Sequence, residues 1–429
     1  MSALTVAPAP RLAGEFRAPG DKSISHRALI LSALSDGPCR IVGLADGADV
    51  SRTRSALAML GVPIRETEAG LLVEGVGLRG LQPPTRPIYC GNSGTTLRLL
   101  AGVLAGQPWP SELTGDGSLL GRPMGRVTIP LREMGAALEA TELGAVERAP
   151  IRVHGCRPLT AIHHESPWAS AQVKSAILLG GLYARGRTQV TEPHRSRDHT
   201  ERMLSERGVP VVVDGTTVAL DGPAERIEHL DATVPGDPSS AAFLLGAAAM
   251  LPRSVVGVEG ICLANSRRGF IDALAAMGAD VTVDEEAGSV IVRGGAPLAG
   301  IEFGGAEVVR CLDELPLLAV VAARAEGRTV VRDAAELRVK ESDRIANTCE
   351  LLRLLGVEVE ERPDGLAIQG DPDRPFDSFT YDAPGDHRMV MAAAVAALSA
   401  SGDCILGPAD AVMSSWPGFW RALEGLRCR

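Results

Sequence analysis

Lysine occurs at three positions in this chain, Lys22, Lys174 and Lys340, and arginine supplies every other Lys/Arg position. A lysine ammonium is a compact charge that can approach a phosphate or transfer a proton, whereas the larger, planar guanidinium of arginine stays protonated. A genome biased toward arginine codons explains the arginines. Lys22 and Lys340 stand among other charged residues, so the sequence predicts that they act chemically. For Lys174, function and chance both stay open.

Polar side chains at the start of the first apolar helix are arranged for anion binding. Lys22 opens the segment KSISHRALILSA, and Ser23 and Arg27, four residues apart, share one helix face. The free N–H groups and the dipole of a helix N-terminus attract phosphate or carboxylate groups. The motif is not a P-loop, which needs glycine directly before the lysine, because Asp21 occupies that place.

Comparable groups recur later in the chain. The turn 92–96, sequence NSGTT, offers backbone N–H groups and hydroxyls, although a plain N-cap is the simpler explanation. Further candidates are Arg122, Ser170, Gln172, Arg197, Asp313, Lys340, Glu341, Arg344 and Arg388. Each of these residues also has an ordinary structural explanation, such as an N-cap for Asp313 or a surface cation for Arg122. Together, these residues in a chain of net charge −10 predict a pocket for a multiply anionic small molecule, with a base and an acid inside it.

The elements that must position these residues form a repeat. An apolar helix rich in small residues, preceded by a polar or glycine-containing turn, begins near Gly20, Asn92, Ala169, Gly236, Asp313 and Asp386. A short strand, a second helix and a hairpin of period-2 strands follow, as in GADVTVDEEAGSVIVRG. The sequence therefore predicts an α/β chain of six β-α-β-α-β-β units. A solenoid is the alternative for repeats of this length.

Six units in 429 residues suggest two domains, since single cores rarely grow beyond about 250–300 residues. Pro-Gly-Asp occurs at 19–21, 235–237 and 384–386, and the first two copies are the best hinges. The sequence predicts an inserted domain, 19–234, and a discontinuous domain, 1–18 with 235–429, each of three units. The strand before residue 19 is expected to return to the discontinuous domain.

Composition argues against several classes of protein. A net charge of −10 disfavours a nucleic-acid-binding surface, which needs a basic face. The chain has no apolar run of the roughly 20 residues that a membrane span requires, and no hydrophobic signal segment at its start. Eight scattered cysteines without metal-ligand spacing predict free thiols in the cytoplasm and no zinc site.

Seven motifs, taken in order, resemble those of the EPSP synthase (3-phosphoshikimate 1-carboxyvinyltransferase) family. They are PGDKSISHRALILSAL, GNSGTTLRLL, GDGSLLGRPM, SAQVKSAILL, DELPLLAV, ELRVKESDRI and DHRMVMAAA, and the match runs from Pro19 to Trp416. The resemblance implies a two-domain enolpyruvyl-transferase-like fold with three βαβαββ units per domain. It also implies a transferase of the shikimate pathway, in aromatic amino-acid biosynthesis. The implied reaction moves the enolpyruvyl group of phosphoenolpyruvate onto the 5-hydroxyl of shikimate 3-phosphate, and glyphosate competes with phosphoenolpyruvate.

The resemblance implies a role for each matched residue. Shikimate 3-phosphate is expected to contact Lys22, Ser23, Arg27, Ser170, Ala171, Gln172, Arg197, Asp313 and Lys340. Phosphoenolpyruvate is expected to contact Lys22, Gly94, Arg122, Gln172, Arg344 and Arg388. Asp313 matches the base for the 5-hydroxyl proton, Glu341 matches the proton donor to the methylene carbon, and Lys22 is the third catalytic residue. No cofactor or metal is implied, and the partners are the two small substrates, bound by a monomer.

Two other functions stay open. The UDP-N-acetylglucosamine enolpyruvyl transferases usually carry a cysteine in the loop corresponding to 115–124, and this loop has none. A non-catalytic protein that binds phosphorylated ligands would gain nothing from the carboxylates Asp313 and Glu341. Many EPSP synthases carry a lysine before a C-terminal Phe-Pro, where this chain has the segment 414–417, SSWP, which puts one phosphate contact in doubt.

Overall fold

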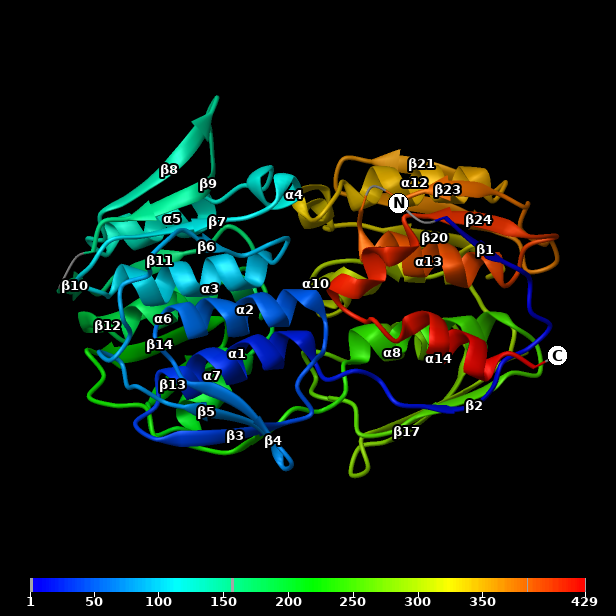
Figure 1. Ribbon diagram of the computed structural model, residues 1–429. Coiled ribbons are helices and arrows are strands. Elements are labelled where there is room, and N and C mark those ends of the chain that lie inside the picture. Colours follow the sequence, from blue (N-terminus) through cyan, green and yellow to red (C-terminus); the bar gives the residue numbers. More distant parts are fainter. Residues whose placement is uncertain (1–2, 156–157, 384, 429) are drawn as a thin grey trace. The chain divides into compact units, whose positions relative to one another are not determined.

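The chain forms two compact units, which are described separately. The computed structural model describes residues 3–155, 158–383 and 385–428. Unit 1 comprises Met1–Asp21 and Pro235–Arg429, and unit 2 comprises Lys22–Val234 (Figure 1). Pro384 of the third Pro-Gly-Asp and Cys156, one of the eight cysteines, lie outside the described residues.

The predicted repeat is clearest in the second sheet of unit 2. Its elements are, in chain order, β6 (Ile88–Tyr89), α3 (Gly94–Ala105), β7 (Ser111–Thr114), the short α4 (Gly117–Leu120), α5 (Gly125–Glu133), β8 (Leu138–Leu143) and β9 (Val146–Val153). The strands lie in the order β6-β7-β9-β8, with β6 parallel to β7 and the hairpin antiparallel. This arrangement is the β-α-β-α-β-β unit expected from the sequence.

The other two sheets of unit 2 follow the same plan. The first, in the order β15-β3-β5-β4, is built from β15 (Ala232–Thr233), β3 (Pro38–Val42), β5 (Gly70–Glu74) and β4 (Ile64–Thr67), with helices α1 (Lys22–Ala33) and α2 (Ala48–Met59). The third contains β10 (Leu159–Thr160), β11 (His163–Glu165), β12 (Ala184–Thr191), β14 (Thr217–Gly222) and β13 (Val211–Asp214), with helices α6 (Ala171–Gly181) and α7 (His199–Ser205).

The described residues of unit 1 also form three sheets. The first orders β2 (Ala13–Phe16), β16 (Val255–Val258), β18 (Ser289–Arg293) and β17 (Asp280–Asp284), with α8 (Pro238–Met250) and α9 (Gly269–Ala276). The second orders β19 (Glu302–Phe303), β20 (Gly327–Val331), β22 (Gly365–Gly370) and β21 (Glu358–Arg362), with α10 (Ala306–Cys311), η1 (Leu312–Glu314), α11 (Leu315–Ala322), η2 (Ala335–Val339) and α12 (Arg344–Leu354). The third orders β1 (Leu4–Val6), β24 (Cys404–Gly407) and β23 (Thr380–Asp382), with α13 (His387–Ala397), η3 (Ala409–Ser414) and α14 (Phe419–Leu426).

The sixth repeat departs from the predicted pattern. Its strand β24 is parallel to β23 and antiparallel to β1, so its sheet has three strands. A strand from the start of the chain therefore takes the place beside β24 that a hairpin strand takes in the other repeats. Among the described residues, no helix is both long and apolar enough to cross a membrane.

The chain passes between the two units twice. The strand before each passage pairs within a sheet of the unit that the chain leaves. β2, which precedes α1 of unit 2, pairs in parallel with β16 in unit 1. β15, which precedes α8 of unit 1, pairs in parallel with β3 in unit 2. The strand before residue 19 thus pairs within unit 1, the unit made of two separate parts of the chain.

The first boundary lies after Asp21, and not after residue 18 as the sequence predicted. The Asp21 N–H donates to the carbonyl oxygen of Pro235 over 2.7 Å. The buried Asp21 carboxylate lies 2.8 Å from the guanidinium of Arg267. Residues 19–21 therefore belong to unit 1, because the backbone and the side chain of Asp21 are both bound there.

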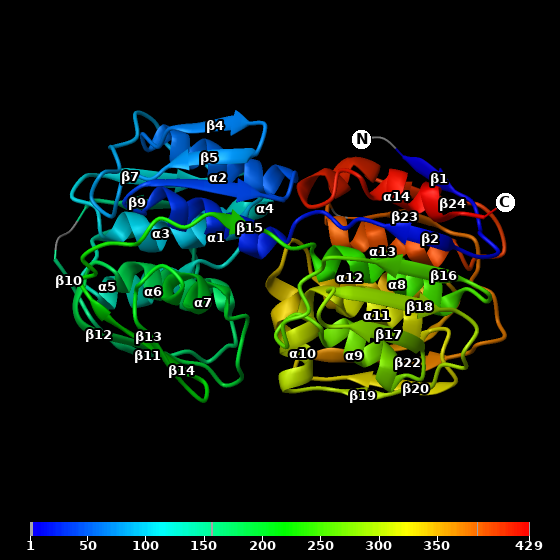
Figure 2. The same ribbon diagram turned by 90° about the horizontal axis from the view of Figure 1, so that it is seen from below.

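Each unit buries apolar helices in its interior. Figure 2 shows α8, α11 and α13 within unit 1. All their residues are buried, as expected for helices that are apolar around most of their circumference. In unit 2, α3 and α6 pack closely at Gly102, where a Cβ would collide with the carbonyl group of Ala176. This packing brings the first turns of α3 and α6 together, and these turns carry Gly94 and Gln172.

Candidate active site

Lys22, the first residue of α1, forms an ion pair with Asp49 in the first turn of α2. Lys22 Nζ lies 2.9 Å from Asp49 Oδ2, and the two side chains are 17% and 11% exposed. Asp49 therefore orients the ammonium group. The sequence reasoning missed Asp49, because an acidic residue in the first turn of a helix is common for reasons of helix stability alone.

Arg27 is enclosed by groups from three helices. Its Nε donates to Thr200 Oγ1 over 2.7 Å, and its Nη2 donates to Ser175 Oγ over 2.7 Å and to the carbonyl oxygen of Ala171 over 3.3 Å. Its Nη1 donates to the carbonyl oxygen of Ser23 over 3.0 Å. The guanidinium thus connects α1, α6 and α7, which are far apart in sequence.

Two loops bring further predicted residues to the same place. Ser170 is the N-cap of α6, and its hydroxyl accepts from the N–H of Val173. Arg197, in the loop before α7, donates from Nη1 to Ser23 Oγ over 3.3 Å. Ser23, Arg27, Ala171 and Arg197, all predicted to bind shikimate 3-phosphate, are therefore joined by hydrogen bonds.

Gly94 opens α3 where two guanidinium groups converge. A Cβ at Gly94 would lie 3.1 Å from Arg122 Nη1 and 3.3 Å from Arg98 Nη1. Arg122 is 6% exposed and donates to the side-chain oxygen of Asn92. The bare backbone of the helix start and the two cations suit an anionic ligand.

Gln172 links the α6 turn to α3. Its Oε1 accepts from Arg98 Nη1, and its Nε2 donates to Thr95 Oγ1 over 2.9 Å. Arg98, which is 8% exposed, also donates to the carbonyl oxygen of Pro123 over 3.2 Å. The sequence reasoning missed Arg98. Arg98 could have been recognised as a lone arginine in an otherwise apolar helix, one turn after Gly94. A charged side chain buried in such a helix needs polar partners, which indicates a site.

In unit 1, Arg344 contacts three carboxylates from the start of α12. Its Nη2 lies 2.7 Å from Glu341 Oε2, and its Nη1 lies 3.3 Å from Asp313 Oδ1. Its Nε lies 2.8 Å from Asp386 Oδ2. Lys340 Nζ lies 3.6 Å from Asp313 Oδ1. The structure thus brings the expected base, the expected acid and two expected cations together.

The charge of Arg344 is strongly stabilised. Burial by itself lowers the pKa of Arg344, but the carboxylates of Asp386, Glu341 and Asp313 outweigh burial and raise this pKa above its usual value. The guanidinium is therefore a permanent cation with 2% side-chain exposure. An anionic substrate bound here would compete with these carboxylates for its N–H groups.

Arg388, near the start of α13, shares one carboxylate with Arg344. The N–H of Arg388 donates to Oδ1 of Asp386, the N-cap of α13, over 2.9 Å. Its Nη1 donates to the carbonyl oxygen of Ser239 over 3.1 Å and lies 4.0 Å from Glu314 Oε1. Asp386 therefore orients both arginines that were expected to bind phosphoenolpyruvate.

The predicted site residues divide between the two units, and we name each group by its unit. The unit 2 cluster consists of Lys22, Ser23, Arg27, Gly94, Arg122, Ser170, Ala171, Gln172 and Arg197. The unit 1 cluster consists of Asp313, Lys340, Glu341, Arg344 and Arg388. In the described part of the chain, no group of three or more His, Cys, Asp or Glu side chains could hold a metal ion.

Ser414 stands near the position where many relatives have lysine. It is the last residue of η3, and its hydroxyl donates to the carbonyl oxygen of Ala411 over 2.9 Å. The ring of the nearby Trp416 stacks on Phe16 with a centroid distance of 6.1 Å. A short hydroxyl group bound to its own backbone cannot supply the charge of a lysine.

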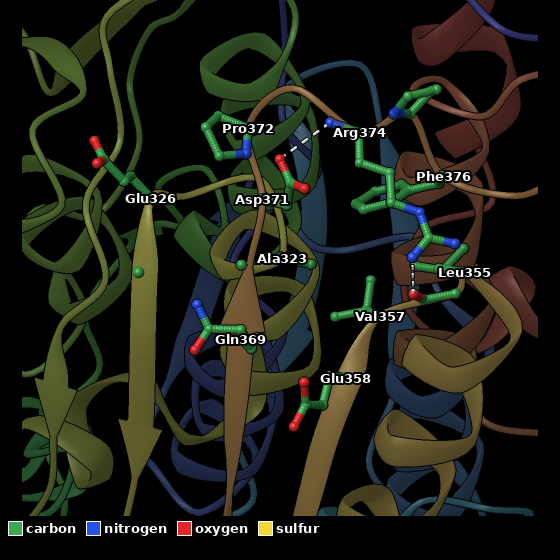
Figure 3. Close-up of a pocket in the computed structure, with 14 residues that line it drawn as sticks. Ala323, Glu326, Leu355, Val357, Glu358, Gln369, Asp371, Pro372, Arg374 and Phe376 are labelled. Atoms are coloured by element: carbon green, nitrogen blue, oxygen red, sulfur yellow. Dashed lines mark hydrogen bonds between the residues drawn. The ribbon is translucent and has the colours of Figure 1, made fainter.

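A surface pocket of about 460 Å³ in unit 1 lies apart from these residues. It is lined by the starts of β20 and β21 and the end of β22, and it contains the carboxylates of Glu326, Glu358 and Asp371 (Figure 3). Arg374 at this pocket donates to the carbonyl oxygen of Gly356 over 2.7 Å. None of the predicted site residues lines the pocket, and its acidic lining disfavours an anionic ligand.

Sequence comparison finds the same family over nearly the whole chain. The family model described as EPSP synthase (3-phosphoshikimate 1-carboxyvinyltransferase) matches residues 6–423. A Geobacillus kaustophilus protein named 3-phosphoshikimate 1-carboxyvinyltransferase is 46% identical over 422 residues, which cover 97% of this chain and 98% of that protein. A protein of the same name from Acidithiobacillus ferrooxidans is 49% identical over 427 residues, which cover 98% and 96%.

Solved structures agree with the sequence comparison. An EPSP synthase from Acinetobacter baumannii has a TM-score of 0.85 and 38% identity, covering 100% of this chain and 98% of its own. The enolpyruvyl transferase NikO from Streptomyces tendae has a TM-score of 0.81 at 18% identity, covering 99% and 97%, and this likeness shows the fold alone. These structures confirm the enolpyruvyl-transferase-like fold predicted from the sequence.

Proposed function

This chain belongs to the EPSP synthase family, and from that premise we propose that it transfers the enolpyruvyl group of phosphoenolpyruvate to the 5-hydroxyl of shikimate 3-phosphate. The products are 5-enolpyruvylshikimate 3-phosphate and phosphate. The reaction lies in the shikimate pathway, which leads to chorismate and the aromatic amino acids. Transfer to UDP-N-acetylglucosamine and a purely binding role remain the competing functions that the experiment below tests.

The contact of Arg344 with both Asp313 and Glu341 carries this proposal. Enolpyruvyl transfer needs a cation for an anionic substrate, a base for a hydroxyl proton and an acid for a carbon atom. The carboxylates of Asp313 and Glu341 lie 3.3 Å and 2.7 Å from the guanidinium of Arg344. Asp386 already compensates the charge of Arg344, so a protein that only bound anions would gain nothing from two further carboxylates at this cation.

The proposed chemistry moves two protons and exchanges one C–O bond for another. The 5-hydroxyl oxygen attacks C2 of phosphoenolpyruvate while Asp313 accepts the hydroxyl proton. The methylene carbon takes a proton from Glu341. Phosphate then leaves with its bridging oxygen as the C2–O bond breaks. The new methyl group returns one proton to Glu341 to restore the double bond, and Asp313 passes the hydroxyl proton to the released phosphate. A positioned acid or base typically contributes about 10²–10⁴-fold.

The remaining residues are proposed to bind the two anions. Shikimate 3-phosphate is assigned to Lys22, Ser23, Arg27, Ser170, Ala171, Gln172, Arg197, Asp313 and Lys340. Phosphoenolpyruvate is assigned to Lys22, Gly94, Arg122, Gln172, Arg344 and Arg388. The burial of Arg27, Arg122, Arg344 and Arg388 supports their roles, because charge-assisted hydrogen bonds to phosphate and carboxylate are stronger where water is excluded.

Phosphate release by the purified protein tests the function. We expect release that requires both phosphoenolpyruvate and shikimate 3-phosphate, and no release when UDP-N-acetylglucosamine replaces shikimate 3-phosphate. Asp313→Ala protein is the matched control for contaminating phosphatase. Phosphate release from phosphoenolpyruvate with UDP-N-acetylglucosamine, and not with shikimate 3-phosphate, would show that the protein is a UDP-N-acetylglucosamine enolpyruvyl transferase. Binding of shikimate 3-phosphate without any turnover would favour the non-catalytic role.

We further propose that the protein acts as a monomer in the cytoplasm, with no nucleic-acid or membrane partner. The net charge of −10 supports the absence of a nucleic-acid partner. The described cysteines are free thiols, as is usual in a reducing compartment: Cys39, Cys90, Cys262, Cys311, Cys349, Cys404 and Cys428. Light scattering coupled to size exclusion tests the monomer, and a mass of twice 44.8 kDa would contradict it.

A further inference from the structure

Lys174 lies between two carboxylates in the interior of unit 2. Its Nζ is 2.9 Å from Glu192 Oε2 and 2.7 Å from Glu201 Oε1, and the three side chains are 1%, 1% and 4% exposed. Lys174 belongs to α6, Glu192 follows β12, and Glu201 belongs to α7. Moving three charges out of water is costly, and removal of one partner leaves a buried charge uncompensated. The ammonium is thus the counter-charge that holds three elements together.

Glu192 anchors the two loops of the unit 2 cluster. Its Oε1 accepts from the backbone N–H of Ser170 over 2.8 Å. The hydroxyl of Ser196, the residue before Arg197, lies 2.7 Å and 2.8 Å from the two oxygens of the same carboxylate. One buried side chain therefore sets the position of the N-cap of α6 and of the segment that carries Arg197.

Glu201 anchors α7 at the level of Arg27. Its chain neighbour Thr200 accepts from Arg27 Nε over 2.7 Å and is hydrogen-bonded to Ser175 Oγ, also over 2.7 Å. Ser175 follows Lys174 on α6 and accepts from Arg27 Nη2 over 2.7 Å. The Lys174–Glu201 contact therefore joins α6 to α7 beside the two hydroxyls that hold the Arg27 guanidinium.

We propose that Lys174 is a positioning residue for the binding of shikimate 3-phosphate, a role that rests on the function proposed above. Its ammonium holds Glu192 and Glu201, and these carboxylates set the backbone at Ser170 and the hydroxyls around Arg27. Lys174 acts through these residues and does not itself bind the ligand. Without the ammonium, two buried carboxylates repel each other and the loops lose their common anchor.

The position needs lysine rather than arginine. An ammonium is small enough to approach two carboxylates at 2.9 Å and 2.7 Å in a space with 1% exposure. A planar guanidinium is larger and would push α6 and α7 apart. This requirement explains a lysine in a chain that uses arginine almost everywhere else, and it resolves the alternative that the sequence left open.

Calorimetric titration with shikimate 3-phosphate, in the absence of phosphoenolpyruvate, is the direct test. We expect Lys174→Met and Lys174→Arg to raise the Kd for shikimate 3-phosphate by roughly tenfold or more. The KM for phosphoenolpyruvate and kcat at saturating shikimate 3-phosphate should change by less than about threefold. Addition of Glu201→Gln to Lys174→Met removes one uncompensated charge and should restore part of the affinity.

Arg207→Met is the matched control for loss of a buried cation in the same unit. Arg207 is 1% exposed and donates to the carbonyl oxygens of Met203 and Leu230, so its described partners lie outside the unit 2 cluster. This variant should lose stability but keep the wild-type Kd for shikimate 3-phosphate. If Lys174→Met does not fold, the Kd of the Glu201→Gln variant tests the proposal instead. We expect this variant to raise the Kd for shikimate 3-phosphate by about threefold or more.

Each remaining outcome overturns the proposal in a distinguishable way. Wild-type affinity in folded Lys174→Met or in Glu201→Gln would show that Lys174 does not position the ligand site, while the proposed function would stand. If Arg207→Met raised the Kd for shikimate 3-phosphate as much as Lys174→Met does, the loss of affinity would be a consequence of general destabilisation and the proposal would be wrong. Absence of shikimate 3-phosphate binding by the wild-type protein would overturn the proposed function and this inference with it.

Discussion

Arg344 and Asp386 form a two-pronged ion pair that is almost completely buried. Nε of the arginine lies 2.8 Å from Oδ2 of the aspartate, its Nη2 lies 3.2 Å from Oδ1, and the side chains are 2% and 0% exposed. Asp386 also caps α13 and receives a hydrogen bond from Ser342 Oγ over 3.0 Å. One aspartate therefore orients Arg344 and the helix start that carries Arg388.

Asp386→Asn should weaken phosphoenolpyruvate binding. Asparagine is as good an N-cap as aspartate, so α13 keeps its start while the charge that aligns Arg344 is lost. We expect the KM for phosphoenolpyruvate to rise roughly tenfold, which corresponds to about 1.4 kcal/mol. The KM for shikimate 3-phosphate should change little. Steady-state kinetics with each substrate varied would check this, and equal rises in both constants would contradict a specific role.

Lys22→Arg should remove most of the activity although the charge is kept. The ammonium of Lys22 lies 2.9 Å from Asp49 in a partly buried position, and a bulkier guanidinium cannot occupy the same point between two anionic ligands. Turnover measured at saturating concentrations of both substrates checks this. Lys22→Met is the control for loss of charge, and near-wild-type turnover of the arginine variant would refute the argument about size.

Asp313→Ala and Glu341→Ala should differ in kind from Arg27→Ala. The two carboxylates are proposed to act on protons in the transition state, so their loss should mainly lower kcat, by about 10²-fold or more. Arg27 is proposed to bind shikimate 3-phosphate in the ground state, so its loss should mainly raise the KM for that substrate. Kinetic constants for the three variants test the assignment, and the reverse pattern would exchange the roles.

Gly94→Ala should make the protein resistant to glyphosate. A methyl group at this position would lie 3.1 Å from Arg122 Nη1 and 3.3 Å from Arg98 Nη1, within the space where an anion meets both cations. Glyphosate is longer than phosphoenolpyruvate and should be obstructed more. We expect inhibition of the natural chain, a higher inhibition constant for the variant and a modest loss of phosphoenolpyruvate affinity. Equal inhibition constants at matched substrate saturation would rule out the steric explanation.

Glu147→Gln should change the dependence of stability on pH. Two hydrogen bonds from Arg132, of 2.8 Å and 2.9 Å, hold the pKa of Glu147 below its ordinary value of 4.5. A carboxylate whose pKa is lowered on folding stabilises the protein above its unfolded-state pKa, and this stability is lost as the pH falls through the folded-state pKa. We expect the variant to melt about 1–3 °C lower at pH 7.

The difference in melting temperature should shrink as the pH falls below about 4.5, because both proteins are then without the ionised side chain. Arg132→Gln is the matched control and should show the same dependence. Melting curves from pH 7 to pH 3 provide the measurement. A difference that stays constant over this range would mean that the Arg132–Glu147 pair contributes through packing and not through charge.

The sequence by itself determined the repeat, the fold class and the family. Hydrophobic periodicity and turn residues are local properties, so the β-α-β-α-β-β unit can be recognised wherever it recurs. The motifs around Lys22, Gly94 and Lys340 are also local, and they identify the family before any contact is known. Glu341 and Arg344 even form their ion pair across three residues of chain. The roles assigned to these residues stay predictions until the experiments above are done.

Only the tertiary structure decided which side chains meet across distant segments. The partners of Lys174 lie beyond the next strand and on the next helix, so no local pattern distinguishes a functional lysine from an accidental one. The same holds for the Arg98–Gln172 contact and for the boundary after Asp21, which depends on a buried arginine far along the chain. A buried charged side chain pairs with the group that the fold places beside it, and the spacing of residues in the sequence does not predict which group that is.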